Sequence, residues 1–369
     1  GNSIVSGGNY NVVVGDEAGT AITTGDNNTA VGYSAGLANT TGTNNTFMGS
    51  LSGDANTTGN NNVSVGKSSF SANTTGSSGT AVGKSSLAAN TTGANNTAVG
   101  ESCLAANTTA ANNTAVGFGS LGANTTGTRN SAMGSIALDA NTEGNYNSAF
   151  GYNSLGANTT GTHNTALGDF SQAANTTGTK NVSVGQGSFI SNTTGDNNTV
   201  VGTEALDQNT TADNNTAVGF QSLKANTTGT FNTAVGNNAG DAITTGGRNI
   251  AIGSSALTSD TVGSRAVAIG YEALATQNFT SATDNYNIGI GFQAGYAVTT
   301  GVQNTFIGGL AGDATTTANN NTAVGYFSLS ANTTGTANTA VGQNSLLTNT
   351  TASNNTAIGR FSLRLNTTG

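Results

Sequence analysis

The pentapeptide Asn-Thr-Ala-Val-Gly at residues 96–100 returns at residues 113–117, and close variants of it recur along the whole chain. If its glycine is taken as a marker, 21 copies run from Gly15 to Gly359 at a spacing of 17 residues, with a single 21-residue step. The fullest form of the unit is x-N-T-A-V-G-x-x-S-L-x-A-N-T-T-G-x. Because self-similarity at a fixed period is the signature of repeat architectures, this unit decides the fold.

Each copy carries a short apolar stretch around the marker glycine. The residue before the marker is apolar in all 21 copies, and the residue three before it is Thr or a β-branched aliphatic in almost every copy. Since β-branched residues favour pleated strands, we expect one short strand there. The third residue after the marker is always Ala, Ser or Cys, with mostly Leu, Phe or Gly next, which predicts a second short strand.

The closing Asn-Thr-Thr-Gly is turn chemistry, because Asn and Thr side chains close turns on the backbone and Gly accepts positive φ. Ala replaces this Gly in four copies, so we expect that positive φ is not required there. An Asn precedes the Thr column in 19 of 21 copies, and we expect these side chains to stack as an amide ladder.

Two short strands per 17 residues predict an all-β parallel solenoid of 21 stacked coils, which at about 4.8 Å per coil makes a rod on the order of 100 Å long. The absence of Pro agrees, since nearly every strand amide must donate to the next coil. We expect one continuous repeat domain over residues 1–369. It divides into an irregular lead-in (1–9), regular coils (10–274), an insertion loop (275–284) and regular coils (285–369).

The alternation of side chains along a strand predicts which residues face inward. We expect the apolar column before the marker to form the core, at Val14, Val31, Val65, Val99, Val116, Val218, Ile252 and Val324. The Ala column and the marker Gly would then face outward without ever carrying a charge. Because a strand with two apolar faces must be covered on both, we expect a self-association face at Ala30, Gly32, Ala81, Gly83, Ala98, Gly100, Ala115, Gly117, Ala217, Gly219, Ala323 and Gly325.

Composition excludes several functional classes. With one Cys and one His, the chain offers neither a disulfide framework nor a His/Cys metal cluster, and we expect no metal, no cofactor and no catalysis. A net charge of −8 with nine cations argues against nucleic-acid binding, and no apolar run is long enough to span a bilayer.

Individual residues give weak functional signals. Cys103 occupies a small inward column, so packing explains it, and His163 occupies a variable, solvated column. The best carboxylate stack is Asp196 with Asp213, which could at most help to hold a cation. Fourteen Asn-Thr-Thr turns are also candidate N-glycosylation sites, although turn chemistry alone accounts for them: Asn39, Asn56, Asn73, Asn90, Asn107, Asn124, Asn158, Asn175, Asn192, Asn209, Asn226, Asn332, Asn349 and Asn366.

The string N-T-A-V-G-x-x-S-L resembles the head repeats of trimeric autotransporter adhesins, whose consensus is close to N-S-V-A-I-G-x-x-S. It also resembles N-T-A-V-G/N-T-T-G arrays in phage and bacterial tail-fibre-like proteins. The similarity covers Tyr10 to Gly369. It implies a left-handed β-roll with three chains side by side, displayed on a cell or virion surface and used for attachment. Adhesin repeats are usually shorter than 17 residues, and the neck, stalk and anchor of that family have no counterpart in these repeats.

We therefore expect a structural and adhesive segment of an extracellular fibre, a homotrimer that meets itself and a host surface or glycan receptor. One alternative is a filament subunit that stacks end to end. A smaller alternative is an ice-binding solenoid, disfavoured because the two Thr of each turn are consecutive and cannot form one flat Thr-x-Thr rank.

Overall fold

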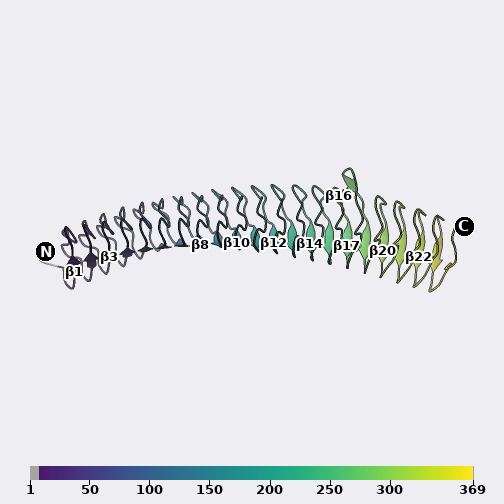
Figure 1. Ribbon diagram of the computed structural model, residues 1–369, viewed down its shortest axis with the longest axis horizontal. Helices are drawn as coiled ribbons and strands as arrows, with labels where there is room; N and C mark the ends of the chain where they lie inside the picture. Colours follow the sequence, from purple (N-terminus) through teal and green to yellow (C-terminus); the bar gives the residue numbers. More distant parts are fainter. Residues whose placement is uncertain (1–7, 369) are drawn as a thin grey trace. The chain divides into compact units, whose positions relative to one another are not determined.

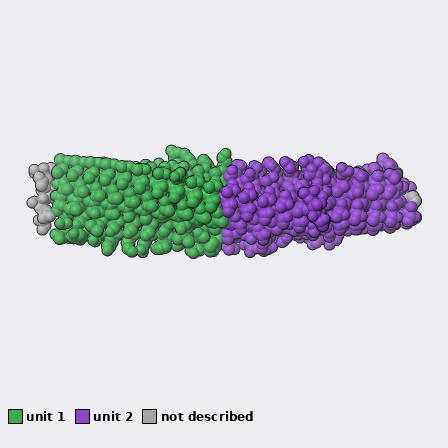
Figure 2. Space-filling model, turned by 90° about the horizontal axis from the view of Figure 1, so that it is seen from above, with its two compact units in different colours: residues 1–180 green, residues 181–369 purple. Residues whose placement is uncertain are grey.

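The computed structural model describes residues 8–368, and these residues contain strands and turns but no helix. The chain forms two compact units, residues 1–180 and residues 181–369 (Figure 2). Each unit is a parallel β-solenoid in which every 17-residue coil contributes one three-residue strand (Figure 1). The first seven residues of the predicted lead-in, and Gly369, lie outside the described part.

The strands of the first unit are β1 (Val12–Val14), β2 (Thr29–Val31), β3 (Thr46–Met48), β4 (Val63–Val65), β5 (Thr80–Val82), β6 (Thr97–Val99), β7 (Thr114–Val116), β8 (Ser131–Met133), β9 (Ser148–Phe150) and β10 (Thr165–Leu167). Those of the second unit are β11 (Val182–Val184), β12 (Thr199–Val201), β13 (Thr216–Val218), β14 (Thr233–Val235), β15 (Ile250–Ile252), β17 (Val267–Ile269), β19 (Ile288–Ile290), β20 (Thr305–Ile307), β21 (Thr322–Val324), β22 (Thr339–Val341) and β23 (Thr356–Ile358). Outside the lengthened coil the pairing register is 17 residues, as in Thr216 with Thr233. The predicted stacking of coils is confirmed.

The second apolar segment of each coil is not a strand, so that prediction was wrong. Its residues lie in turns, where φ becomes positive at alternate positions, as at Ser85 (56°) and Leu87 (49°). Alternate left-handed residues prevent an extended ladder, yet the intervening small residue and the Leu both point into the coil, and Leu87 is fully buried. The closing Gly of the unit has no positive φ, as the Ala substitutions predicted.

The predicted assignment of inner and outer faces is inverted. The alanines expected on an outer contact face lie in the core with at most 1% exposure: Ala30, Ala81, Ala98, Ala115, Ala217 and Ala323. The residues expected in the core are half-buried or exposed on the outside: Val14, Val31, Val65, Val99, Val116, Val218, Ile252 and Val324.

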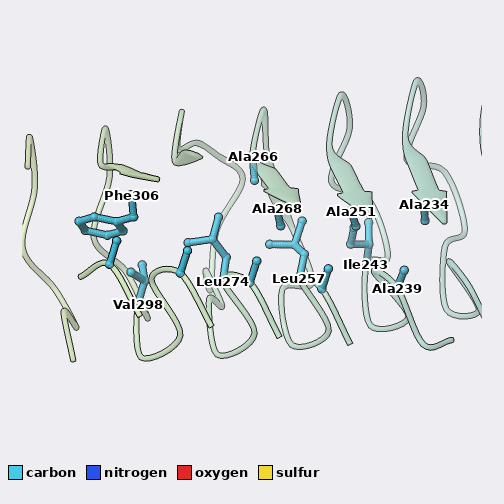
Figure 3. Close-up of a cluster of buried hydrophobic side chains, with 14 of the residues drawn as sticks. Ala234, Ala239, Ile243, Ala251, Leu257, Ala266, Ala268, Leu274, Val298 and Phe306 are labelled. Atoms are coloured by element: carbon cyan, nitrogen blue, oxygen red, sulfur yellow. The ribbon is translucent and has the colours of Figure 1, made fainter. Parts of the chain in front are cut away.

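The reason is the width of the coil. In most coils a buried Leu from the turn segment reaches across the interior, and this leaves room for no more than a methyl group on the strand. Where the strand carries a Phe instead, the turn segment carries glycines: a Cβ added to Gly36 would lie 2.7 Å from the Phe47 ring, and one added to Gly295 would lie 2.8 Å from the Phe306 ring. Figure 3 shows Phe306, Leu274 and the strand alanines in the shared interior of the second unit.

The marker glycines are not an outer contact face either. Gly219 has a φ of 133°, and a Cβ built on it would collide with the carbonyl group of Gly236 in the next coil. The same holds for Gly32, Gly83, Gly100, Gly117 and Gly325. Glycine recurs at this column because adjacent coils approach too closely there for a side chain.

Two columns of buried Asn amides link the coils. In the predicted ladder, the backbone N–H of Asn113 donates to Asn96 Oδ1 (3.0 Å), while Asn96 Nδ2 donates to the Ala110 carbonyl (2.8 Å). This ladder is confirmed, although amide-to-backbone bonds carry most of it. The second ladder, formed by the Asn of the Asn-Thr-Thr turns, was not foreseen: Asn107 Nδ2 donates to Asn90 Oδ1 at 2.8 Å and to Ala110 O at 3.0 Å.

The lengthened coil carries the insertion, which stands out beside β16 in Figure 1. Its base is a two-residue parallel pairing of β16 (Gly263–Ser264) with β18 (Thr283–Asp284). Beneath it, the fully buried Asp260 occupies the second Asn column and accepts hydrogen bonds from Gln277 Nε2 (2.7 Å) and the Gly263 N–H (3.0 Å). Burial raises the pKa of this carboxyl, and the hydrogen bonds oppose that shift.

Substituting Lys at the buried strand alanines will destabilise the fold rather than split an assembly. Ala115→Lys and Ala217→Lys each place an unpaired charge inside a coil, which costs several kcal/mol. Val116→Lys and Val218→Lys, one residue away on the outer face, will change the free energy of unfolding by less than about 1 kcal/mol. Chemical denaturation followed by circular dichroism measures both. Equal losses for the two pairs would contradict the inverted assignment.

The second unit will gain stability from Asp260 on acidification. Because the pKa of Asp260 is raised in the folded chain, its contribution is full below the unfolded value of 3.8 and is lost as pH rises through the folded pKa. Asp260→Asn, which restores the common residue of the column, will flatten this dependence. Unfolding free energies measured from about pH 3 to pH 8 check the prediction. An unchanged pH dependence in the variant would assign it to other groups.

Candidate binding face

Four columns of side chains face outward around each strand. The first and third strand residues form the outer strip, as in Thr216 and Val218. The residue two before the strand forms the left-handed column, named for its φ near 60°, as in Asn214. The residue after the marker glycine forms the flanking column, as in Phe220. Strand alternation places all four on one side of the coil, since the buried Asn and Ala lie between them.

The outer strip carries no charged residue in any coil. In the second unit all of its residues are Thr, Val or Ile, whose branched side chains hold one main rotamer. In the first unit it also includes Met48, Met133, Phe150 and Leu167. Exposure reaches 37% at Val99, Val235 and Ile307, so apolar surface is open to solvent in both units. This is the ordered apolar surface that was expected of the alanines.

The flanking column adds exposed aromatic rings beside the strip. Phe118 is 57% exposed, and the other members are Tyr33, Tyr152, Phe220, Tyr271, Phe292 and Tyr326. Tyr271 and Phe292 stack across adjacent coils with ring centroids 5.6 Å apart and planes 10° apart. The apolar surface of each unit therefore extends past the strand on this side.

The left-handed column is Asn in nine coils, and Asn tolerates this backbone conformation better than most residues do. Two runs of four coils depart from Asn: Arg129, Tyr146, His163 and Lys180 in the first unit, and Phe231, Arg248, Arg265 and Tyr286 in the second. Within the first run, Tyr146 stacks on His163 at 4.8 Å, and the guanidinium of Arg129 lies 5.2 Å from the Tyr146 ring.

The glycosylation candidates lie in the wrong place for modification of the folded chain. Asn366 is half-buried, and the other thirteen side chains are fully buried, with printed ladder hydrogen bonds throughout the set. A glycan on Nδ2 would have to replace the amide bonds that join the coils. The candidates so corrected are Asn39, Asn56, Asn73, Asn90, Asn107, Asn124, Asn158, Asn175, Asn192, Asn209, Asn226, Asn332, Asn349 and Asn366.

The remaining single residues follow their columns. Cys103 is buried in the small inward column, its Sγ lies 2.8 Å from the Gly117 carbonyl oxygen, and burial raises the pKa of its thiol to about 11. His163 is exposed, as expected. Asp213 Oδ1 accepts the backbone N–H of Asp196 at 2.7 Å, so this carboxylate caps the neighbouring coil. In the part of the chain that the structure describes, no three His, Cys, Asp or Glu residues gather as metal ligands.

Sequence reasoning missed the outer strip because it assigned the larger residues of the strand to the core. A signal for the correct assignment is present in the repeat itself. The two Phe of the Ala column, Phe47 and Phe306, occur where the turn segment has Gly in place of Leu. Such reciprocal changes in volume show that both columns share one interior.

Residues 8–368 include no helix that is long and apolar enough to cross a membrane. No protein-family model, no curated protein and no solved structure matches the chain.

Proposed function

We propose that the chain is a structural, non-enzymatic segment of an extracellular fibre, and that copies of it associate side by side through the outer strip. The observation that carries this proposal is the uncharged, ordered apolar strip, which is repeated in every coil and open to solvent. Exposed apolar patches larger than a few hundred Å² are unusual on monomers and mark interaction sites.

The size of the face supports a second copy as its occupant. Ten coils of one unit extend about 50 Å at ~4.8 Å each, and four outward columns at two-residue spacing span about 20 Å. The resulting face of about 1,000 Å² exceeds the ~800 Å² that each partner buries in a stable interface. Aromatic side chains, which are enriched at protein interfaces, border the strip on its flanking side.

Charge also favours association at this strip. The protein carries a net charge of −8, so two copies repel each other over most of their surfaces. The strip holds no charged residue, and a contact there buries no unpaired carboxylate or ammonium group. Identical strips also match each other at every coil. The number of copies, three in the adhesin heads that the repeat resembles, is part of the proposal.

Adding charge to the strip will therefore separate the copies without unfolding them. We expect the purified chain to exceed its 36.1 kDa monomer mass by light scattering, and Val218→Lys/Val235→Lys to return it to the monomer. A matched control, Thr211→Lys/Thr228→Lys, adds the same charge at exposed turn positions of neighbouring coils and will leave the mass unchanged. A monomeric native chain, or equal dissociation by both variants, would contradict the proposal.

The fibre assignment itself is tested on the producing cells or particles. Antibodies against the repeat will label fibres on intact surfaces by electron microscopy. Label confined to permeabilised cells would contradict the extracellular assignment, whatever the oligomeric state.

Ice binding is a second candidate that the structure brings back. The Thr that matter are not the consecutive pair of the turn but those of the strands, which alternate with Val or Ile on the outer strip of the second unit. This gives flat ranks of hydroxyl and methyl groups in a regular array. A thermal-hysteresis measurement decides between the two: a monomer that shapes growing ice crystals favours this candidate, and an associated chain without hysteresis removes it.

A further inference from the structure

The left-handed column holds a feature that neither the fold nor self-association requires. Its backbone geometry is the same in every coil: φ is 58° at Asn95, 58° at Arg129, 59° at Tyr146 and 57° at Lys180. Side chains other than Asn, Asp or Gly are uncommon in this conformation. Four successive coils of the first unit nevertheless replace Asn with Arg, Tyr, His and Lys. Strained residues cluster where a surface has a task.

These four residues, Arg129, Tyr146, His163 and Lys180, define the basic patch. All four are exposed. The left-handed column contains four of the nine cations of the chain and its single His, and it contains no carboxylate in any coil. Among the described residues, no carboxylate lies within ion-pair distance of Arg129 or Lys180. The patch therefore presents positive charge on a protein whose net charge is −8.

The side chains of the patch are ordered along the stacking direction. Tyr146 lies between the guanidinium of Arg129, to which its hydroxyl is hydrogen-bonded, and the imidazole of His163. The ring faces are thus covered and their edges are turned to solvent. Beside them, half-buried hydroxyl and amide groups hydrogen-bond from coil to coil, as Thr128 Oγ1 does to Asn145 Oδ1 at 2.9 Å.

The comparable run in the second unit differs in one respect. There the guanidinium of Arg265 forms an ion pair with Asp284 at 3.1 Å and donates to the Tyr286 hydroxyl at 3.0 Å. Part of its charge is therefore neutralised within the protein. This contrast singles out the patch of the first unit.

We propose that the basic patch binds an acidic polysaccharide laid along the coils, with its carboxylate or sulfate groups on Arg129 and Lys180. These two cations are three coils apart, about 14 Å at ~4.8 Å per coil. Such sparse charge suits a glycan with one anionic group every sugar or two, whereas duplex DNA presents one charge per ~1.7 Å. The Tyr and Thr hydroxyls and the Asn amides are suited to sugar hydroxyls.

This inference deepens the proposed function by giving the fibre a class of ligand. It does not depend on the outer strip, so association and glycan binding can fail separately.

The chain supplies its own test variants. Arg129→Asn/His163→Asn/Lys180→Asn restores the common residue of the column, so the unfolding midpoint will stay unchanged or rise. We expect the native chain to be retarded in gels containing polygalacturonate but not in gels containing dextran. The triple variant will bind polygalacturonate at least about tenfold more weakly, because it loses its charge-assisted hydrogen bonds. The control Lys67→Ser/Lys84→Ser removes two cations from the flanking column and will bind as the native chain does.

Three results would overturn the inference. They are absence of retardation of the native chain, equal affinity of the triple variant, and retardation by single-stranded DNA as strong as that by polygalacturonate at the same salt concentration. Light scattering on the same samples reports association independently.

Discussion

The structure depends on the transfer of hydrogen bonds from each coil to the next. A coil of 17 residues with a three-residue strand cannot satisfy its own backbone, so its amides and carbonyls pair with residues 17 positions away, as Thr216 does with Thr233. The buried Asn columns satisfy the groups that the strands leave over. The marker glycines permit the close approach on which this transfer depends, because a Cβ at Gly219 would collide with the next coil. Chemistry is therefore confined to side chains that face outward.

The interior of a coil is narrow, and its width decides which side chains lie inside. A Leu from the turn segment and an Ala from the strand fill it together, and Phe47 replaces that pair where the turn segment has Gly. Val and Thr of the strand are thereby left outside. The order is the reverse of a simple ranking by hydrophobicity, since volume rather than polarity decides the placement. The apolar residues thus excluded from the core form the surface by which we propose that copies of the chain meet.

The period, the strand position, the parallel stacking and one Asn ladder were all predictable, because each follows from the residue types of single columns. The direction of the strand faces was not, because Ala and Val are both compatible with a core and a column taken alone does not report volume. The Asn-Thr-Thr turns were misjudged for a related reason. Asn107 belongs to a turn and to a buried ladder at once, and turn chemistry accounted for it fully before its neighbours were known. The exposed Arg129–Tyr146 contact needs the left-handed backbone, which no residue type at that column predicts.

The placement of the two strand faces is the claim on which the binding proposals rest, and thiol accessibility tests it directly. In a Cys103→Ser background, which uses the common residue of that column, one variant carries Ala234→Cys and another Val235→Cys. At dilutions where the chain is monomeric, we predict that the thiol at 235 reacts with a soluble maleimide at nearly the rate of a free thiol. The thiol at 234, where the native side chain is fully buried, will react only after unfolding. Rapid labelling at 234 with protection at 235 would contradict the account.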